Sequence, residues 1–205
     1  MTVIASTFLA GFALSAALIM AIGAQNLFVL RQGLRREHVG PIVLICGCAD
    51  AILIAAGVGG AGAILATAPR LAGALSAGGA VFLFWYGAKA LRRAASPGAM
   101  DASGGEPQPL GRALAAAAAF TFLNPHAYLD TVLVMGAAGS AQVPGLRPTF
   151  ALGAAAASFA WFAALGFGAR KLSRLFAKPA AWRVLDAAVG ATMLSLAASL
   201  ALHAV

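Results

Sequence analysis

Two aspartates stand inside long apolar stretches of this sequence, where a carboxylate is costly unless it has a partner or water. Asp50 lies nine residues after Pro41, where one stretch begins. At 1.5 Å per helical residue, this is about 13 Å into a hydrocarbon layer about 30 Å thick. Such an acid usually faces a binding site or a proton path, although it can also fix helix packing. We therefore expect Asp50 to bind a proton or a substrate. For Asp130, nearer the outer end of its stretch, an interfacial role is equally supported.

Two short polar elements interrupt the apolar pattern at corresponding places in the two halves of the chain. The first contains Gly23, Gln25 and Asn26, and the second contains Asn124 and Pro125. Because a proline removes a backbone hydrogen bond and clashes with the preceding turn, the second helix should break or kink there. Side-chain amides donate and accept hydrogen bonds, so they suit a zwitterionic substrate and an interhelical clamp equally well. We predict interrupted helices at Gly23 and Pro125, with the amides facing inward.

Four further side chains carry chemistry that a site could use. His126 could titrate near neutral pH, and with Tyr128 it is a candidate for a gate, although a histidine beside a proline is as often structural. Cys46 and Cys48 are two residues apart and so face different sides of one helix, which argues against a disulfide between them. Together with Asp50 they cannot converge on a tetrahedral metal ion. We expect no metal and no other cofactor.

The composition indicates a membrane protein. Of 205 residues, 61% are hydrophobic and 10% charged, whereas soluble domains are about 45–50% apolar and 25% charged. The net charge of +8 comes from basic residues at the ends of apolar runs, where they would meet lipid headgroups, so we expect no nucleic-acid partner. No nucleotide-binding loop, hydrolase elbow or zinc-protease motif is present. We therefore expect a protein that is not an enzyme and that uses gradients.

Six apolar segments are long enough to cross a bilayer as helices. They divide the chain into a first three-helix repeat (1–90), a cytoplasmic linker (91–112) and a second three-helix repeat (113–205). An odd number of spans in each half gives the halves opposite orientations, as in the inverted repeats of many secondary transporters. The predicted spans are Val3–Leu30, Pro41–Ala66, Leu71–Ala90, Leu114–Met135, Thr149–Gly168 and Val184–Leu202.

The basic residues predict the orientation of these spans. Twelve of them fall in or beside the loops after the first, third and fifth spans, and two, Arg70 and Arg147, fall on the other side. Since basic loops stay in the cytoplasm, both termini are predicted outside. Asp186 lies three residues after Arg183, and we expect an ion pair between them rather than a part of the site.

The stretches MAIGAQNLFVLRQGLRREHV (20–39) and FTFLNPHAYLDTVLVMG (120–136) resemble the two signature regions of the LysE/ArgO family of lysine and arginine exporters. CADAILIAAGVGG (48–60) and FWYGAKALRRA (84–94) extend the resemblance over nearly the whole chain. In the related homoserine/threonine exporters, the first signature region looks instead like a Pro-Gly-Pro element. This sequence has Gly-Ala-Gln-Asn there, and the resemblance therefore favours the basic amino-acid branch. The functional core that the resemblance implies is Gln25, Asn26, Asp50, Asn124, Pro125 and Asp130.

The function that follows is a secondary transporter in the cytoplasmic (inner) membrane that exports L-arginine, L-lysine or both, in exchange for protons. Asp50 would alternate between a proton and the cationic substrate, because desolvation favours a neutralised carboxylate. Its partners would then be a basic amino acid, protons and membrane lipids, with a homo-oligomer left open. Two alternatives remain: an exporter of neutral amino acids such as threonine or homoserine, and, in a different class, a membrane thiol-redox carrier that uses the cysteines.

Overall fold

A computed structural model of the chain describes residues 2–20, 23–61, 69–95, 108–124, 127–172, 176 and 178–203. These residues are mostly helical, and no β-strand occurs among them. The α-helices are α1 (Thr2–Ile19), α2 (Ala24–Arg35), α3 (Val39–Ala56), α5 (Pro69–Ala95), α6 (Leu110–Phe122), α8 (Met135–Ser140), α9 (Arg147–Gly168) and α10 (Pro179–His203). The π- and 3₁₀-helical segments are η1 (Gly57–Ala61), η2 (Tyr128–Val134), η3 (Pro144–Leu146) and η4 (Ala169–Leu172).

Four of these helical stretches are long and apolar enough to cross a membrane, judged by length and composition. The predicted span Leu71–Ala90 lies in α5, which is not one of the four, and Leu114–Met135 is divided among α6, η2 and α8. The structure therefore confirms an all-helical protein, and the arrangement of six spans stays a prediction. The four stretches are Thr2–Ile19, Val39–Ala61, Pro144–Leu172 and Ala180–Leu202.

The first interruption lies where the sequence predicts it. α1 ends at Ile19, and α2 begins after Gly23, whose backbone is extended (φ −106°, ψ 176°). No side chain caps the start of α2, so its first backbone N–H groups have no side-chain acceptor. α2 ends where Arg36 adopts the left-handed conformation (φ 57°), which is a common way to terminate a helix. The first apolar segment is thus two helices.

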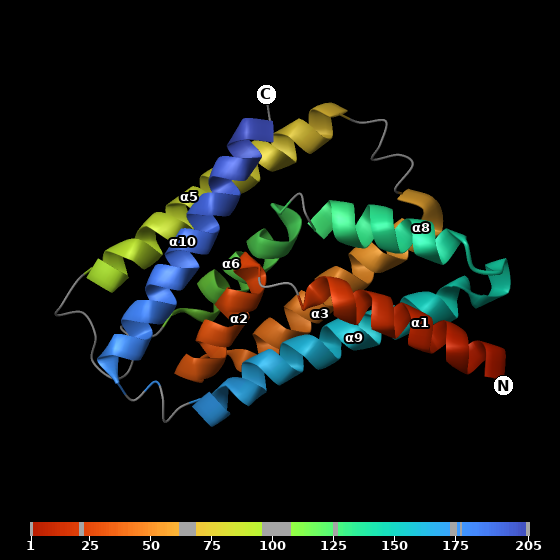
Figure 1. The fold of residues 1–205 in the computed structure, drawn as a ribbon, viewed down its shortest axis with the longest axis horizontal. Helices are drawn as coiled ribbons and strands as arrows, with labels where there is room; N and C mark the ends of the chain where they lie inside the picture. Colours follow the sequence, from red (N-terminus) through yellow and green to blue (C-terminus); the bar gives the residue numbers. More distant parts are fainter. Residues whose placement is uncertain are drawn as a thin grey trace.

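The second interruption follows α6, which ends at Phe122. Pro125 and His126 lie outside the described residues, and the chain resumes at Ala127 with the π-helix η2. The hydroxyl of Tyr128 donates a 2.9 Å hydrogen bond to the carbonyl of Phe122, which bridges the interruption. This bond satisfies one of the carbonyls that end α6 without an intrahelical partner. In Figure 1 both interruptions lie near the middle of the molecule.

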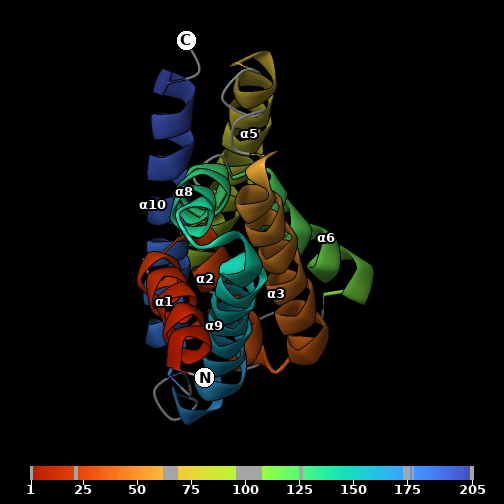
Figure 2. The ribbon, with the colours of Figure 1, turned by 90° about the vertical axis from the view of Figure 1, so that its right-hand side faces the viewer.

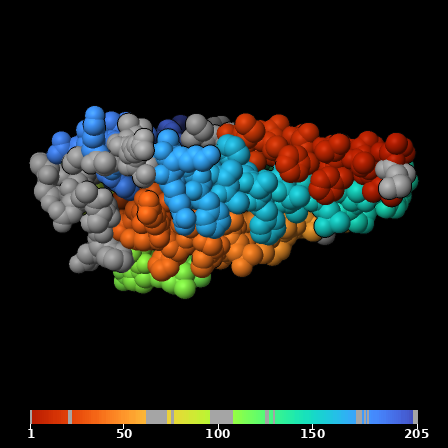
Figure 3. All heavy atoms as spheres, turned by 90° about the horizontal axis from the view of Figure 1, so that it is seen from below, coloured from red at the N-terminus to blue at the C-terminus, as the bar shows by residue number. Residues whose placement is uncertain are grey.

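The packing of the helices interleaves the two halves of the chain. α5 packs along α10, and α9 packs against both α1 and α3, as Figures 1 and 2 show. On the face seen in Figure 3, α9 lies between α1 and α3. A Cβ atom added to Gly11 would lie 2.1 Å from the Phe150 carbonyl oxygen, and one added to Gly153 would lie 2.0 Å from that of Phe8. These glycines therefore let the backbones of α1 and α9 touch, as small residues do in membrane bundles.

The predicted linker 91–112 falls largely outside the described residues, because α5 continues to Ala95 and the description resumes at Gln108. The boundaries 1–90 and 113–205 stay predictions. Large apolar side chains on the outer faces of the helices are exposed, including Val81 (72%) and Val184 (70%). Exposed apolar groups spread over many helices are typical of a lipid-facing surface.

Candidate functional site

A cavity of about 310 Å³ lies where the two interruptions meet. Residues of α1, α2, α3, η2, α8, α9 and α10 line it, together with residues next to both breaks. Among the predicted site residues, the structure brings Gly23, Gln25, Asn26, Asn124, Asp50 and Asp130 to this one cavity. Their shared position does not test what each of them binds.

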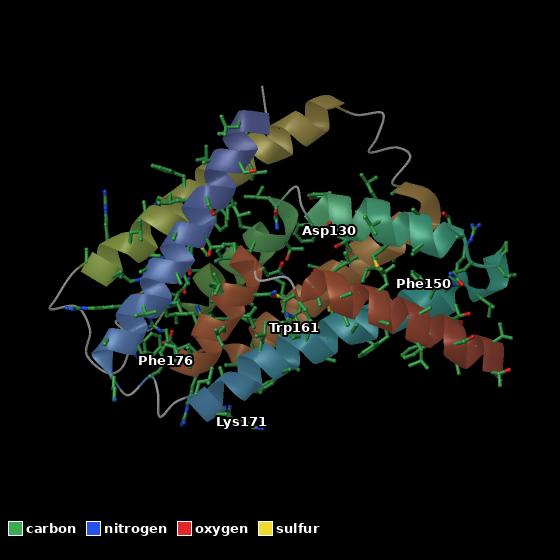
Figure 4. The ribbon with its side chains drawn as sticks, viewed as in Figure 1. Asp130, Phe150, Trp161, Lys171 and Phe176 are labelled. Carbon is green, nitrogen blue, oxygen red and sulfur yellow. The ribbon has the colours of Figure 1, made fainter. Side chains whose placement is uncertain are left out.

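The two predicted acids enter the cavity from different helices. Asp50 of α3 is buried (9% exposed), and the Ser158 hydroxyl of α9 forms a hydrogen bond with its carboxyl group. Asp130 of η2 is exposed and lies near the break after α6 (Figure 4). Neither carboxylate forms an ion pair with any residue that the structure describes. Both acids can therefore receive a cation that the protein does not supply there.

Asn26 joins three parts of the site. Its Nδ2 donates a 2.8 Å hydrogen bond to the carbonyl of Ile19 at the end of α1. Its Oδ1 accepts a 3.2 Å hydrogen bond from Nε1 of Trp161, which lies on α9 near the centre of the molecule in Figure 4. Both atoms of the amide are therefore engaged within the protein. Of the two readings of this amide, the contacts favour the clamp, which holds α1, α2 and α9 together at the break.

Gln25 presents a different environment. Its Nε2 is buried, and the acceptor within its reach is the Cys46 thiol, which is a weak hydrogen-bond acceptor. A stronger acceptor brought by a ligand would satisfy this buried donor better. The backbone N–H groups at the start of α2 lie next to it and favour negative charge. This corner of the cavity is thus suited to a carboxylate.

The remaining predicted residues divide into two groups. Asn124 lines the cavity. Pro125 and His126 lie outside the described residues, and their roles stay predictions. The Tyr128 hydroxyl bonds the end of α6, and Tyr128 is not one of the residues that line the cavity. Its part in a gate stays a prediction.

Sequence reasoning missed the hydroxyl groups of the cavity. Ser158 is the only hydroxyl-bearing residue between Ala151 and Gly168, and it is 1% exposed. A single hydroxyl in such an apolar run is the signal that could have found it. The other hydroxyl residues that line the cavity are Ser15, Thr131, Thr192 and Ser195.

The expected ion pair between Asp186 and Arg183 is wrong. Asp186 is 1% exposed and pairs with Arg31 of α2 and Arg93 of α5, whereas Arg183 is exposed. The spacing of three residues suggested a local pair, but helix packing turns Asp186 toward the bundle interior. This acid lies outside the cavity.

The two cysteines do not form a disulfide. Cys46 is buried, Cys48 is exposed, and both are free thiols on α3. Among the residues that the structure describes, no group of three or more His, Cys, Asp and Glu side chains could hold a metal ion.

Comparison with known proteins decides the family. The family model of LysE type translocators matches residues 16–204. The chain belongs to the LysE family. It is 43% identical over 199 residues to the arginine exporter protein ArgO of Yersinia enterocolitica, and the match covers 96% of both chains. It is 49% identical over 178 residues to a protein of Mycobacterium tuberculosis (strain H37Rv) named as a candidate amino-acid transporter, covering 87% of this chain and 88% of the other. No solved structure matches the chain significantly.

This LysE family member is therefore a multi-pass membrane transporter and not an enzyme. The cavity fits that class because interrupted helices commonly carry the binding sites of secondary transporters. It holds two acids without cationic partners among the described residues and one amide donor whose acceptor is a weak one, the Cys46 thiol. The acids of this site can bind the positive groups of a small zwitterion, and the Gln25 amide can donate to its negative group.

Proposed function

We propose that this protein exports L-arginine, L-lysine or both from the cytoplasm in exchange for protons. The observation that carries the proposal is the pair Asp50 and Asp130 in one cavity, neither with a cation among the described residues. A basic amino acid has two cationic groups and one anionic group, which the two acids and the Gln25 corner complement. The relative named as an arginine exporter supports the same substrate class.

The three groups of the substrate would occupy three parts of the cavity. Asp50 would bind the cationic side chain, and Asp130 would bind the α-amino group or act as a gate. The α-carboxylate would accept hydrogen bonds from Gln25 Nε2 and from backbone N–H groups at the interrupted helices near Asn26 and Asn124.

Exchange follows from the chemistry of a single carboxylate. Asp50 can bind a proton or a cationic side chain, but not both at once. Because moving one positive charge outward against an inside-negative potential costs about 2.3 kcal/mol per 100 mV, export needs coupling or a steep concentration gradient. Proton entry on Asp50 after substrate release would supply that coupling.

We place the protein in the cytoplasmic membrane with six spans, two inverted repeats and both termini outside. Close contacts of glycines support the repeat. A Cβ on Gly33 would lie 2.2 Å from the Gly166 carbonyl oxygen, and one on Gly136 would lie 2.7 Å from that of Gly57. The first contact joins the segment just after predicted span one to the end of span five. The second joins the segment just after span four to the second half of span two, which is the corresponding pair of elements under a two-fold relation.

Transport in liposomes tests the proposal. The purified protein is reconstituted, a pH gradient is imposed with the membrane potential clamped, and labelled arginine, lysine and threonine are followed separately. The variant is Asp50→Asn, and the matched control is Asp101→Asn, which removes a carboxylate from the predicted linker. We expect gradient-driven arginine or lysine movement in the wild type and the control, and a fall to background in Asp50→Asn.

Each other outcome has a defined meaning. Coupled arginine export by inserted Asp50→Asn protein would remove Asp50 from the mechanism. Movement of threonine alone would assign the neutral amino-acid alternative. The thiol-redox alternative predicts that Cys46→Ala with Cys48→Ala loses all activity, whereas we expect that double variant to export.

A further inference from the structure

A layer of four aromatic rings lies next to the cavity. Phe28 of α2, Phe82 and Tyr86 of α5 and Phe120 of α6 pack with centroid distances between 4.9 and 6.1 Å. Phe28 and Phe120 are each 1% exposed. Phe82 and Phe120 share a small pocket with Ala24, Asn124 and Leu196, which also line the cavity, so the layer adjoins the cavity.

Beyond this layer lies a buried cluster of three charges. Asp186 of α10 pairs with Arg31 of α2 and, at 3.2 Å, with Nη2 of Arg93 of α5. The side chains of Asp186 and Arg31 are 2% and 6% exposed, whereas that of Arg93 is 31% exposed. The Tyr86 ring of the aromatic layer lies close enough to interact electrostatically with all three groups. The cluster and the layer are therefore continuous.

The cluster lies between the cavity and the end of the bundle that carries the basic residues. Arg31 follows Asn26 by five positions, and Asp186 precedes the cavity residue Thr192 by six. At 1.5 Å per residue these separations are roughly 8–9 Å along each helix. Both are directed toward Arg35 and Arg183, on the side that the charge asymmetry assigns to the cytoplasm.

We propose that the Arg31–Asp186–Arg93 cluster, with the aromatic layer above it, is the closed cytoplasmic gate of the transport pathway. The inference rests on the proposed function only for the direction of transport. Asp186 holds α10 to α2 and α5 at once, so a path from the cavity to the cytoplasm requires these helices to separate and the cluster to break. Arg93 is the more exposed of the two partners, and opening begins there.

The charges of the cluster also determine what the closed gate excludes. Two guanidinium groups face one carboxylate, which leaves a surplus positive charge in the cluster. A cation in the cavity is repelled by this surplus, so a released basic amino acid does not return to the cytoplasm. The closed gate therefore favours outward release of cations.

Thiol labelling measures the gate without transport. Thr192→Cys is introduced into a Cys46→Ala, Cys48→Ala background, and a membrane-impermeant, uncharged methanethiosulfonate is applied to right-side-out and to inside-out vesicles. The gate variants are Asp186→Asn and Arg93→Gln. Arg93→Lys keeps the charge, and Arg92→Gln removes an equal charge from the exposed neighbouring position.

Loss of a hydrogen bond between charged groups predicts that labelling from the cytoplasmic side rises about tenfold or more in both gate variants. Arg93→Lys and Arg92→Gln should label like the parent, and so should Asp101→Asn in the predicted linker. Unchanged cytoplasmic labelling in folded Arg93→Gln protein would overturn the gate, even if Asp186→Asn does not fold. Thiol labelling needs no substrate, so it tests the gate even if the protein does not export arginine. The export experiment likewise tests the proposed function even if the labelling contradicts the gate.

Discussion

The two buried aspartates of the bundle differ in their partners more than in their burial. Asp186 is 1% exposed and Asp50 is 9% exposed. Asp186 has two guanidinium partners, whereas the side-chain partner of Asp50 among the described residues is the Ser158 hydroxyl. The charge of Asp186 is compensated by two cations of the protein, whereas Asp50 has no ion-pair partner among the described residues. Asp186 therefore holds helices together, and Asp50 is the acid to which the proposed function assigns transport.

The largest expected difference between the two acids is in stability. Asp186→Asn leaves two guanidinium groups without a carboxylate, and breaking a buried pair in this way costs about 3–5 kcal/mol. Asp50→Asn removes a buried charge that has no ionic partner, so its effect on stability should be near zero or favourable. Unfolding of both variants by denaturant in detergent, followed by tryptophan fluorescence, measures this difference. Equal destabilisation of the two variants would contradict the distinction between a paired Asp186 and an unpaired Asp50.

The sequence predicts the cavity much better than the gate. Polar residues inside apolar runs, such as Asp50 and Gln25, are visible one by one, and the breaks at Gly23 and near Pro125 follow from backbone chemistry. The partners of Asp186 are 155 and 93 positions away in the chain, and helix spacing carries no information on such contacts. Local spacing therefore assigned Asp186 to Arg183, which is wrong.

The number of spans shows a similar limit. The prediction of an all-helical membrane protein needs only composition, and it is confirmed. The count of six depends on α5, which brings Lys89, Arg92 and Arg93 into its last turns, and on α6, which has only 13 residues before the break. A hydrophobic run in the sequence does not specify how its helix is divided or how it is packed.

A smaller effect is expected from the hydroxyl that accompanies Asp50. Ser158→Ala removes one hydrogen bond to a carboxyl group, worth about 1.5–3 kcal/mol when the group is charged. The apparent affinity for arginine should fall about tenfold or more, because the Asp50 side chain is no longer held in place. Ser140→Ala is the matched control, since Ser140 is exposed at the end of α8 and bonds only a neighbouring carbonyl. Concentration dependence of arginine uptake in liposomes tests this, and an unchanged affinity would exclude a positioning role for Ser158.

The smallest expected effect concerns the side-chain amide of Asn26, whose contacts favour a structural role over substrate binding. Trp161→Phe removes the indole N–H that Asn26 Oδ1 accepts, while the bond from Nδ2 to the Ile19 carbonyl remains. Loss of one such bond should cost about 1 kcal/mol of stability. Trp85→Phe changes an exposed tryptophan on α5 and should have little effect on the same unfolding measurement. If Asn26 also binds the substrate directly, Trp161→Phe would change the apparent affinity for arginine as well, because the freed Oδ1 could accept a hydrogen bond from the substrate. The ratio of the stability change to the affinity change therefore decides whether Asn26 belongs with Asp186, among the groups that hold helices together, or with Asp50.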